Sequence, residues 1–99
     1  MTPFSDDAKQ KIVELCKRHH IREISLFGSR ARGDSSPESD YDFLIEFSPT
    51  PRISLFDYGR AWVDFEELMG TKIDLVDKRG LKPFLRESVL AEAKLIYAQ

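Results

Sequence analysis

The stretch GSRARGDSSPESDYDFLIEF, residues 28–47, decides the fold, because a glycine-serine turn precedes two aspartates at the start of an apolar run. The apolar run predicts a β-strand from Asp40 to Phe47. Alternate side chains of a strand point to the same face, so Asp40 and Asp42 are expected to project together. Aspartate is depleted in strands, and an unpaired buried carboxylate is unfavourable. The pair therefore predicts a divalent cation that also binds phosphate.

Gly28 and Ser29 end another predicted strand, Ile21 to Phe27, and begin a short helical turn. A glycine lets the backbone approach an anion, because no Cβ stands in the way. Ser29 offers a hydroxyl and a backbone N–H at a helix start, where phosphate binds readily. The turn and the acidic strand together predict a site for a phosphorylated ligand and Mg²⁺.

Asp74 is the candidate third carboxylate. It lies in a strand predicted from Lys72 to Asp77, on the face opposite Ile73 and Leu75. If that face continues the face of the acidic pair, Asp74 can ligate a second metal ion or accept a proton from an attacking hydroxyl. Asp77 is the rival, but its opposite parity and its place at the strand end favour a solvated turn residue.

A plainer interpretation of the acidic pair is structural. Asp40 would then end a polar turn over 34–39, and Asp42 would be an edge-strand charge that discourages aggregation. A calcium-binding loop is excluded, because Leu44 and Ile45 stand where another oxygen ligand and a glycine are needed. The turn, the pair and Asp74 in combination favour the metal-and-phosphate interpretation.

The remaining chain predicts helices around these strands, because apolar residues recur at helical spacing. The expected order is α-β-α-β-α-β-α, which is typical of one sheet covered by helices in an α/β domain. The segment 95–97 either prolongs the last helix or forms a short terminal strand. The three longer helices are expected over Asp6–Arg18, over Leu55–Met69 with a core stripe of Tyr58, Trp62 and Phe65, and from Pro83 with an inner stripe of Leu85, Val89 and Ala93.

Length and composition limit the classes of function. We expect a single domain over residues 1–99, because 99 residues leave no room for a second one. A net charge of −2 and a pI near 5.7 argue against general binding to nucleic acid. No apolar run approaches the ~20 residues that span a bilayer, and the first residues lack a signal-peptide pattern. The single cysteine, Cys16, is expected to be a buried hydrophobe and fits a reducing compartment, the cytoplasm.

Gly28-Ser29, ten intervening residues, Asp40-Tyr41-Asp42 and a later strand aspartate, Asp74, resemble the signature of the DNA polymerase beta-type nucleotidyltransferase superfamily. The fuller strings around them resemble its small branch, the minimal nucleotidyltransferases (MNT). The resemblance implies a mixed sheet with flanking helices. It also implies transfer of a nucleoside monophosphate from a nucleoside triphosphate to a hydroxyl, with release of pyrophosphate.

The same resemblance assigns roles to residues. It implies that Gly28 and Ser29 hold the triphosphate, that Asp40 and Asp42 bind Mg²⁺, and that Asp74 is the third carboxylate. Arg30 and Arg32 are candidates for a cation that neutralises triphosphate charge. The alternative for each arginine is a solvent-facing residue near a helix end.

Proteins of this branch are commonly antitoxins paired with a helical ribonuclease toxin of the HEPN class. The implied action is transfer of AMP from ATP to a tyrosine of that toxin. One alternative is an antitoxin that neutralises its partner by binding alone, and a third possibility is modification of a small molecule. Phe56 and Tyr97 lie off the clearest apolar stripes and are the expected surface candidates for a partner.

Overall fold

The fold is known from a computed structural model, which describes residues 4–33 and 40–99. The polar segment 34–39, where a turn is expected, lies outside the described residues. In chain order the elements are α1 (Asp6–Arg18), β1 (Ile21–Phe27), α2 (Ser29–Arg32), β2 (Tyr41–Phe47), α3 (Leu55–Met69), β3 (Ile73–Asp77), the short 3-10 helix η1 (Lys78–Gly80), α4 (Pro83–Glu92) and β4 (Lys94–Ala98).

The described strands form a mixed sheet in the order β3-β2-β1-β4. Strand β1 pairs antiparallel with β2 and with β4, whereas β2 and β3 are parallel. The expected α/β class, the mixed sheet and the order of elements are confirmed. The undecided segment 95–97 belongs to β4, a strand. The strands expected from Asp40 and from Lys72 each begin one residue later, at Tyr41 and Ile73.

The helices begin at residues that stabilise helix N-termini. The Ser5 hydroxyl accepts a hydrogen bond from the Ala8 N–H at 3.2 Å. At the start of α3, Ser54 and Asp57 form a capping box, in which each side chain accepts from the other residue's backbone N–H. These contacts satisfy donors that have no partner inside the helix, and they explain why both boundaries follow the sequence closely.

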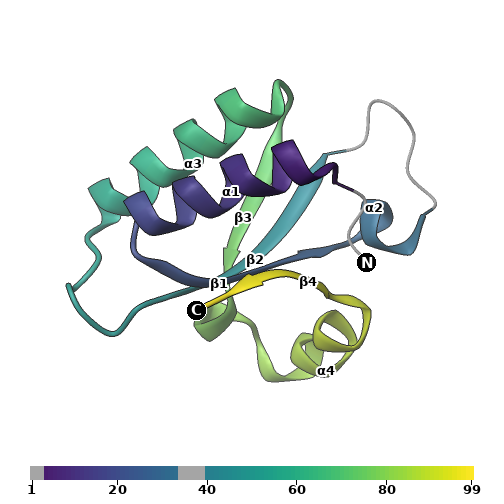
Figure 1. The fold of residues 1–99 in the computed structure, drawn as a ribbon. Coiled ribbons are helices and arrows are strands. Elements are labelled where there is room, and N and C mark those ends of the chain that lie inside the picture. The colour runs from purple at the N-terminus through teal and green to yellow at the C-terminus, as the bar shows by residue number, and fades with distance from the viewer. Residues whose placement is uncertain (1–3, 34–39) are drawn as a thin grey trace.

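Helices α1 and α3 cover one face of the sheet, and the core lies between them and the strands (Figure 1). The stripe expected on α3 is confirmed, because Phe65 is buried and Tyr58 and Trp62 pack against the core. Cys16 is also buried, as expected. The buried apolar residues of this core are Ile12, Leu15, Cys16, Ile21, Ile24, Leu26, Ala31, Phe43, Ile45, Phe47, Ala61, Phe65, Ile73, Leu75 and Ile96.

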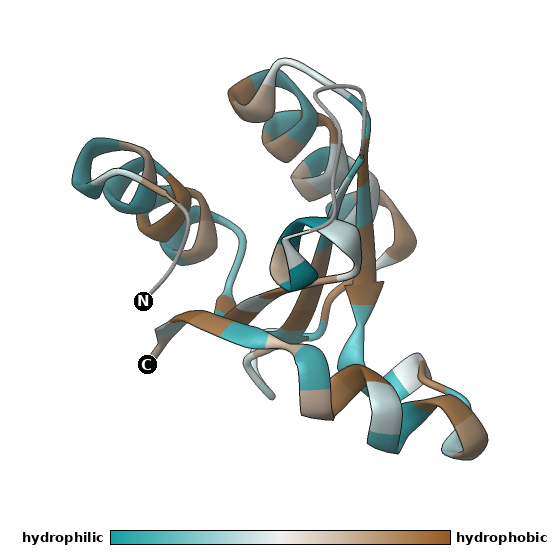
Figure 2. Cartoon of the chain, turned by 90° about the vertical axis from the view of Figure 1, so that its right-hand side faces the viewer, coloured by the Kyte–Doolittle hydropathy of each residue, from teal (hydrophilic) through white to brown (hydrophobic). Residues whose placement is uncertain are grey.

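Helix α4 lies on the opposite face of the sheet, and none of its residues, all of them described, is buried. The expected inner stripe is therefore wrong: Leu85 is 43% exposed. The reason is that α4 contacts the sheet and the other elements only sparsely, so its apolar side chains stay accessible on the face that carries Asp42 and Asp74. Figure 2 shows apolar residues along the strands and an alternation of apolar and polar residues along α4.

Two other expectations about surfaces have opposite outcomes. Phe56 is 85% exposed, which confirms it as a surface residue. Tyr97 packs against the core from β4, so its expected place on the surface is wrong. Within the described part of the chain, no helix has the length and apolar character needed to cross a membrane.

Candidate active site

The two strand aspartates lie side by side. In the parallel pairing of β2 with β3, Asp42 is the register partner of Asp74. Their apolar neighbours, Phe43 and Leu75, are also partners and point into the core. Because side chains alternate along a strand, the two carboxylates face the opposite side, towards α4. Asp40 directly precedes β2, has the parity of Asp42 and is exposed. The sheet thus places Asp42 and Asp74 on a common face, and Asp40 lies just before that strand.

Asp42 carries the electrostatic signature of this arrangement. Burial raises the pKa of the Asp42 carboxyl above its ordinary value. The charges of Asp74 and Asp40 raise that pKa further, and Glu92 adds to the effect, whereas Arg32 opposes it. Like charges held close together disfavour ionisation, and a bound cation would relieve that repulsion. The site therefore has a net negative field that favours a divalent ion.

Position 28 must be a glycine, because the Asp42 carboxylate lies against its backbone. Its φ is +77°, a backbone conformation that residues with a side chain rarely adopt. A Cβ at this position would lie 2.1 Å from Asp42 Oδ2, so the carboxylate packs directly against the glycine backbone. The strand partner of Asp42 on the other side is Phe27, the residue before Gly28. The sheet therefore places the glycine turn directly beside Asp42.

Ser29 begins α2, which is a single turn closed by hydrogen bonds to the Gly28 carbonyl oxygen. The Ala31 and Arg32 N–H groups donate to that oxygen at 3.0 Å and 3.1 Å. This turn separates the two arginines of the motif. The guanidinium of Arg30 lies over the Tyr41 ring, 3.9 Å from its centroid. Arg32 instead reaches the acidic side of the sheet, where it lowers the pKa of Asp42.

A fourth carboxylate, Glu92, joins this group from the end of α4. The Gly28 N–H donates to Glu92 Oε1 at 3.0 Å, and Arg32 Nη1 donates to Oε2 at 3.2 Å. Sequence reasoning missed Glu92, because it lies 64 positions from Gly28 and stands in no motif. Only the return of the chain through β4, which pairs with β1, brings it to the turn.

The donor set suits magnesium. Three carboxylates on adjoining strand ends supply hard oxygen ligands, which Mg²⁺ prefers when it also keeps phosphate oxygens and water. Among the described residues no three such side chains converge closely enough to hold an ion as they stand. The residues that would hold the metal are Asp40, Asp42 and Asp74.

A mixed sheet, a glycine-serine turn and strand aspartates on one face define the class of nucleotide-transferring domains. The chain belongs to the family described as Polymerase beta, Nucleotidyltransferase, whose sequence profile matches residues 10–99. The expected family and the expected enzyme class, a nucleotidyltransferase, are thereby confirmed.

Several known proteins are similar to this chain. The protein adenylyltransferase MntA of Thermococcus cleftensis is 39% identical over 79 residues, which cover 80% of this chain and 78% of that protein. A solved structure described as a minimal nucleotidyltransferase is 39% identical, with a TM-score of 0.75, and the match covers 88% of this chain and 87% of that one.

A more distant structure shares the fold. It contains a tri-AMPylated HEPN toxin of Shewanella oneidensis in complex with an MNT antitoxin, is 19% identical and has a TM-score of 0.68. The match covers 93% of this chain and 71% of that one.

Proposed function

We propose that this protein transfers AMP from ATP to a hydroxyl group of a partner protein, with Mg²⁺ as cofactor. The proposed partner is a HEPN-type ribonuclease toxin, the acceptor is a tyrosine of that toxin, and the protein acts as its antitoxin. The observation that carries the proposal is the register of Asp42 with Asp74 beside the Gly28 turn. The proposed compartment is the cytoplasm, on the basis of the single cysteine.

The chain's residues have separate roles in the proposed reaction. The turn at Gly28 and Ser29 and the guanidinium of Arg32 bind the triphosphate, and their donors orient it. The acceptor oxygen attacks the α-phosphorus, the bond from that phosphorus to the bridging oxygen breaks, and pyrophosphate leaves with the bond electrons. Asp74 accepts the hydroxyl proton. Arg30, held over Tyr41, contributes positive charge to the same turn.

Magnesium has a place in this scheme because the aspartates concentrate negative charge where the triphosphate must come. Asp40, Asp42 and Asp74 would hold the ion. When bound, it supplies charge neutralisation of the triphosphate and of the leaving pyrophosphate. The raised pKa of Asp42 is consistent with this role, since a bound cation would favour the ionised form of that carboxyl.

The relatives support the choice of nucleotide and partner. The MntA protein that shares 39% identity with this chain is a protein adenylyltransferase, which favours AMP as the transferred group and a protein as the acceptor. The structure with an AMPylated HEPN toxin and an MNT antitoxin shares the fold. We extend the partnership to this chain on that fold and on the intact set of site residues.

Label transfer tests the proposal. The purified protein is incubated with Mg²⁺, the HEPN protein encoded beside it and each of the four nucleoside triphosphates labelled at the α-phosphate. We expect label from ATP on a tyrosine of the partner, located by peptide mass spectrometry. No label on any protein with any of the four nucleotides would contradict the proposal.

Neutralisation by binding alone is the second candidate function. The exposed apolar side chains of Leu55, Phe56 and Val63, which lie together along α3, favour it, because a contiguous exposed apolar patch marks a contact surface. The two functions separate in cells that express the toxin together with Asp42→Asn antitoxin. Loss of protection with an intact complex supports catalysis, and full protection supports binding alone.

A further inference from the structure

A carboxylate from α4, that of Glu92, accepts hydrogen bonds from donors of the glycine turn. Glu92 is the last residue of α4, and its Oε1 accepts from the Gly28 N–H at 3.0 Å. Arg32 Nη1 donates to both carboxylate oxygens, at 3.3 Å and 3.2 Å. Figure 1 shows α2 and the end of α4 at the same end of the sheet. One backbone donor and one guanidinium thus hold a single anion.

The same donors are those that the proposed function gives to the triphosphate. A backbone N–H carries one proton, so the Gly28 donor cannot fully serve Glu92 and a phosphate oxygen together. Glu92 also brings a negative charge to the turn, which repels other anions there. A triphosphate placed at the turn would meet the same repulsion. Glu92 and the nucleotide therefore compete for one position.

The contact that holds Glu92 can open at small cost. Every residue of α4 is described and none is buried, so displacement of the end of this helix uncovers little apolar surface. The Glu92 side chain is itself 29% exposed. The next residue, Ala93, is extended rather than helical, with φ −66° and ψ 135°. The carboxylate can leave by rotation of its side chain or by a shift of the last helical turn.

We propose that Glu92 is an intramolecular competitor of the nucleotide, which closes the empty site and leaves when the triphosphate binds. This inference rests on the proposed function of the Gly28 turn. The apparent affinity for nucleotide is then the intrinsic affinity reduced by the fraction of molecules whose site is open. Removal of the Glu92 charge raises that fraction and tightens binding. A residue that oriented the turn for phosphate would have the opposite effect.

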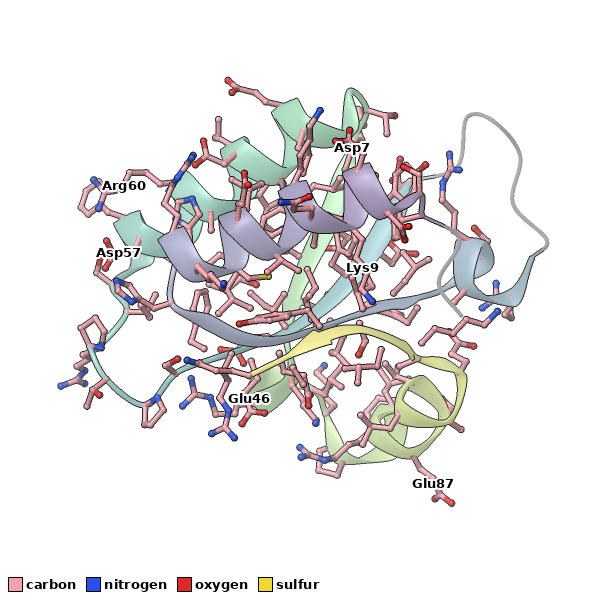
Figure 3. The ribbon with its side chains drawn as sticks, viewed as in Figure 1. Asp7, Lys9, Glu46, Asp57, Arg60 and Glu87 are labelled. Carbon is pink, nitrogen blue, oxygen red and sulfur yellow. The ribbon has the colours of Figure 1, made fainter. Side chains whose placement is uncertain are left out.

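Calorimetric titration with a non-hydrolysable ATP analogue, with and without Mg²⁺, tests this competition. We expect Glu92→Gln to bind the analogue about tenfold more tightly than the unaltered protein, because a charge-assisted contact no longer holds the site closed. Glu92→Ala removes the acceptor as well and should tighten binding at least as much. Glu87→Gln is the matched control, because it makes the same charge change on the same helix. Its side chain points away from the body of the molecule (Figure 3), and its affinity should be unchanged.

The other possible results also decide whether Glu92 competes with the nucleotide. Equal or weaker binding by folded Glu92→Gln, with a melting temperature close to that of the unaltered protein, overturns the competition and leaves the proposed function standing. Weaker binding confined to the titration with Mg²⁺ would make Glu92 a metal ligand and also overturns it. If none of the proteins binds the analogue, the competition and the proposed function fail together.

Discussion

The two faces of the sheet differ in what their side chains do. One face is covered by α1 and α3 and buries aromatic and aliphatic residues such as Phe43 and Phe65. The other carries Asp42 and Asp74 and meets α4, a fully described helix without a buried residue. Strand β2 supplies both faces in alternation, because Phe43 follows Asp42.

This difference shows that alternate residues of one strand have different roles. Those on one face stabilise the fold, and those on the other face form the candidate site. Burial on the covered face, which lies under α1 and α3, offsets the cost of placing carboxylates close together on the other, open face. The open face can therefore hold charged groups near one another. It can also carry a helix, α4, that moves at little cost in free energy. Truncation of buried side chains on the covered face should therefore lower the stability of the protein most, whereas substitutions of the carboxylates on the open face should mainly change ligand binding or catalysis.

The largest expected contrast compares two phenylalanines. Phe65 is fully buried, so Phe65→Ala should lower the free energy of unfolding by about 3–5 kcal/mol. Phe84, on α4, is 77% exposed, and Phe84→Ala should change that free energy by no more than about 0.5 kcal/mol. Urea unfolding followed by circular dichroism measures both. Similar losses for the two variants would show that α4 is part of the core.

Two glycines give the next contrast. Gly28→Ala should cost about 1–3 kcal/mol of stability, since it places a side chain at φ +77° and against the Asp42 carboxylate. It should also abolish nucleotide binding. Gly59 lies in α3, and a Cβ there would meet no described atom within 4 Å apart from its chain neighbours and the backbone of its own helix. Gly59→Ala should instead stabilise the protein by about 0.5–1 kcal/mol. Thermal unfolding of both variants checks the signs, and a neutral Gly28→Ala would refute the close approach of Asp42.

The capping box of α3 predicts a smaller effect on the covered side. Ser54→Ala should lower the free energy of unfolding by about 1 kcal/mol, because the Asp57 N–H loses its acceptor. The backbone hydrogen bond from Ser54, followed by the one from the Arg60 side chain, lowers the pKa of Asp57 to about 2. The folded state therefore favours the carboxylate, and this stabilisation is lost as the pH falls from about 4 to 2. Asp57→Asn should be less sensitive than the unaltered protein to acid in that range, and equal sensitivity would contradict the role of the box.

The smallest effect at neutral pH concerns Cys16. Burial raises the pKa of the Cys16 thiol to about 12, so the folded protein should not react with iodoacetamide at pH 8, whereas protein unfolded in urea should. The unfolded thiol ionises from about pH 9 and the folded thiol only near pH 12. Stability should therefore fall as the pH rises above about 9. Cys16→Ser lacks the thiol and serves as the control, and rapid alkylation of the native protein would show that α1 opens.

The fold was largely predictable from the sequence because its signals are local. The helical spacing of apolar residues and the capping residues predict α1 and α3. The alternation of side-chain direction along β2 and β3 predicts a shared face for Asp42 and Asp74. The terminal strand β4 was not decided, because three apolar residues fit either a helix or a strand. Its pairing with β1 is a long-range contact that local propensity does not contain.

The site was predictable only in part for the same reason. The roles predicted for Gly28, Ser29 and the three aspartates stay predictions, although the sheet brings the turn and the strand aspartates together. The sequence could not distinguish Arg30 from Arg32, whose side chains diverge within one helical turn. Glu92 could not be found, because its place depends on how α4 crosses the open face.

The most direct test of the division between the faces is the rate of AMP transfer by Asp42→Asn. Glu46→Gln is the matched control, because Glu46 lies on the same face of β2 as Asp42 but outside the site (labelled in Figure 3). We expect Asp42→Asn to lower the rate by at least about 100-fold, since it removes several kcal/mol of transition-state stabilisation. Its melting temperature should be unchanged or higher, because a repelled carboxylate is gone, and Glu46→Gln should keep its activity. Full transfer activity in folded Asp42→Asn would contradict the account.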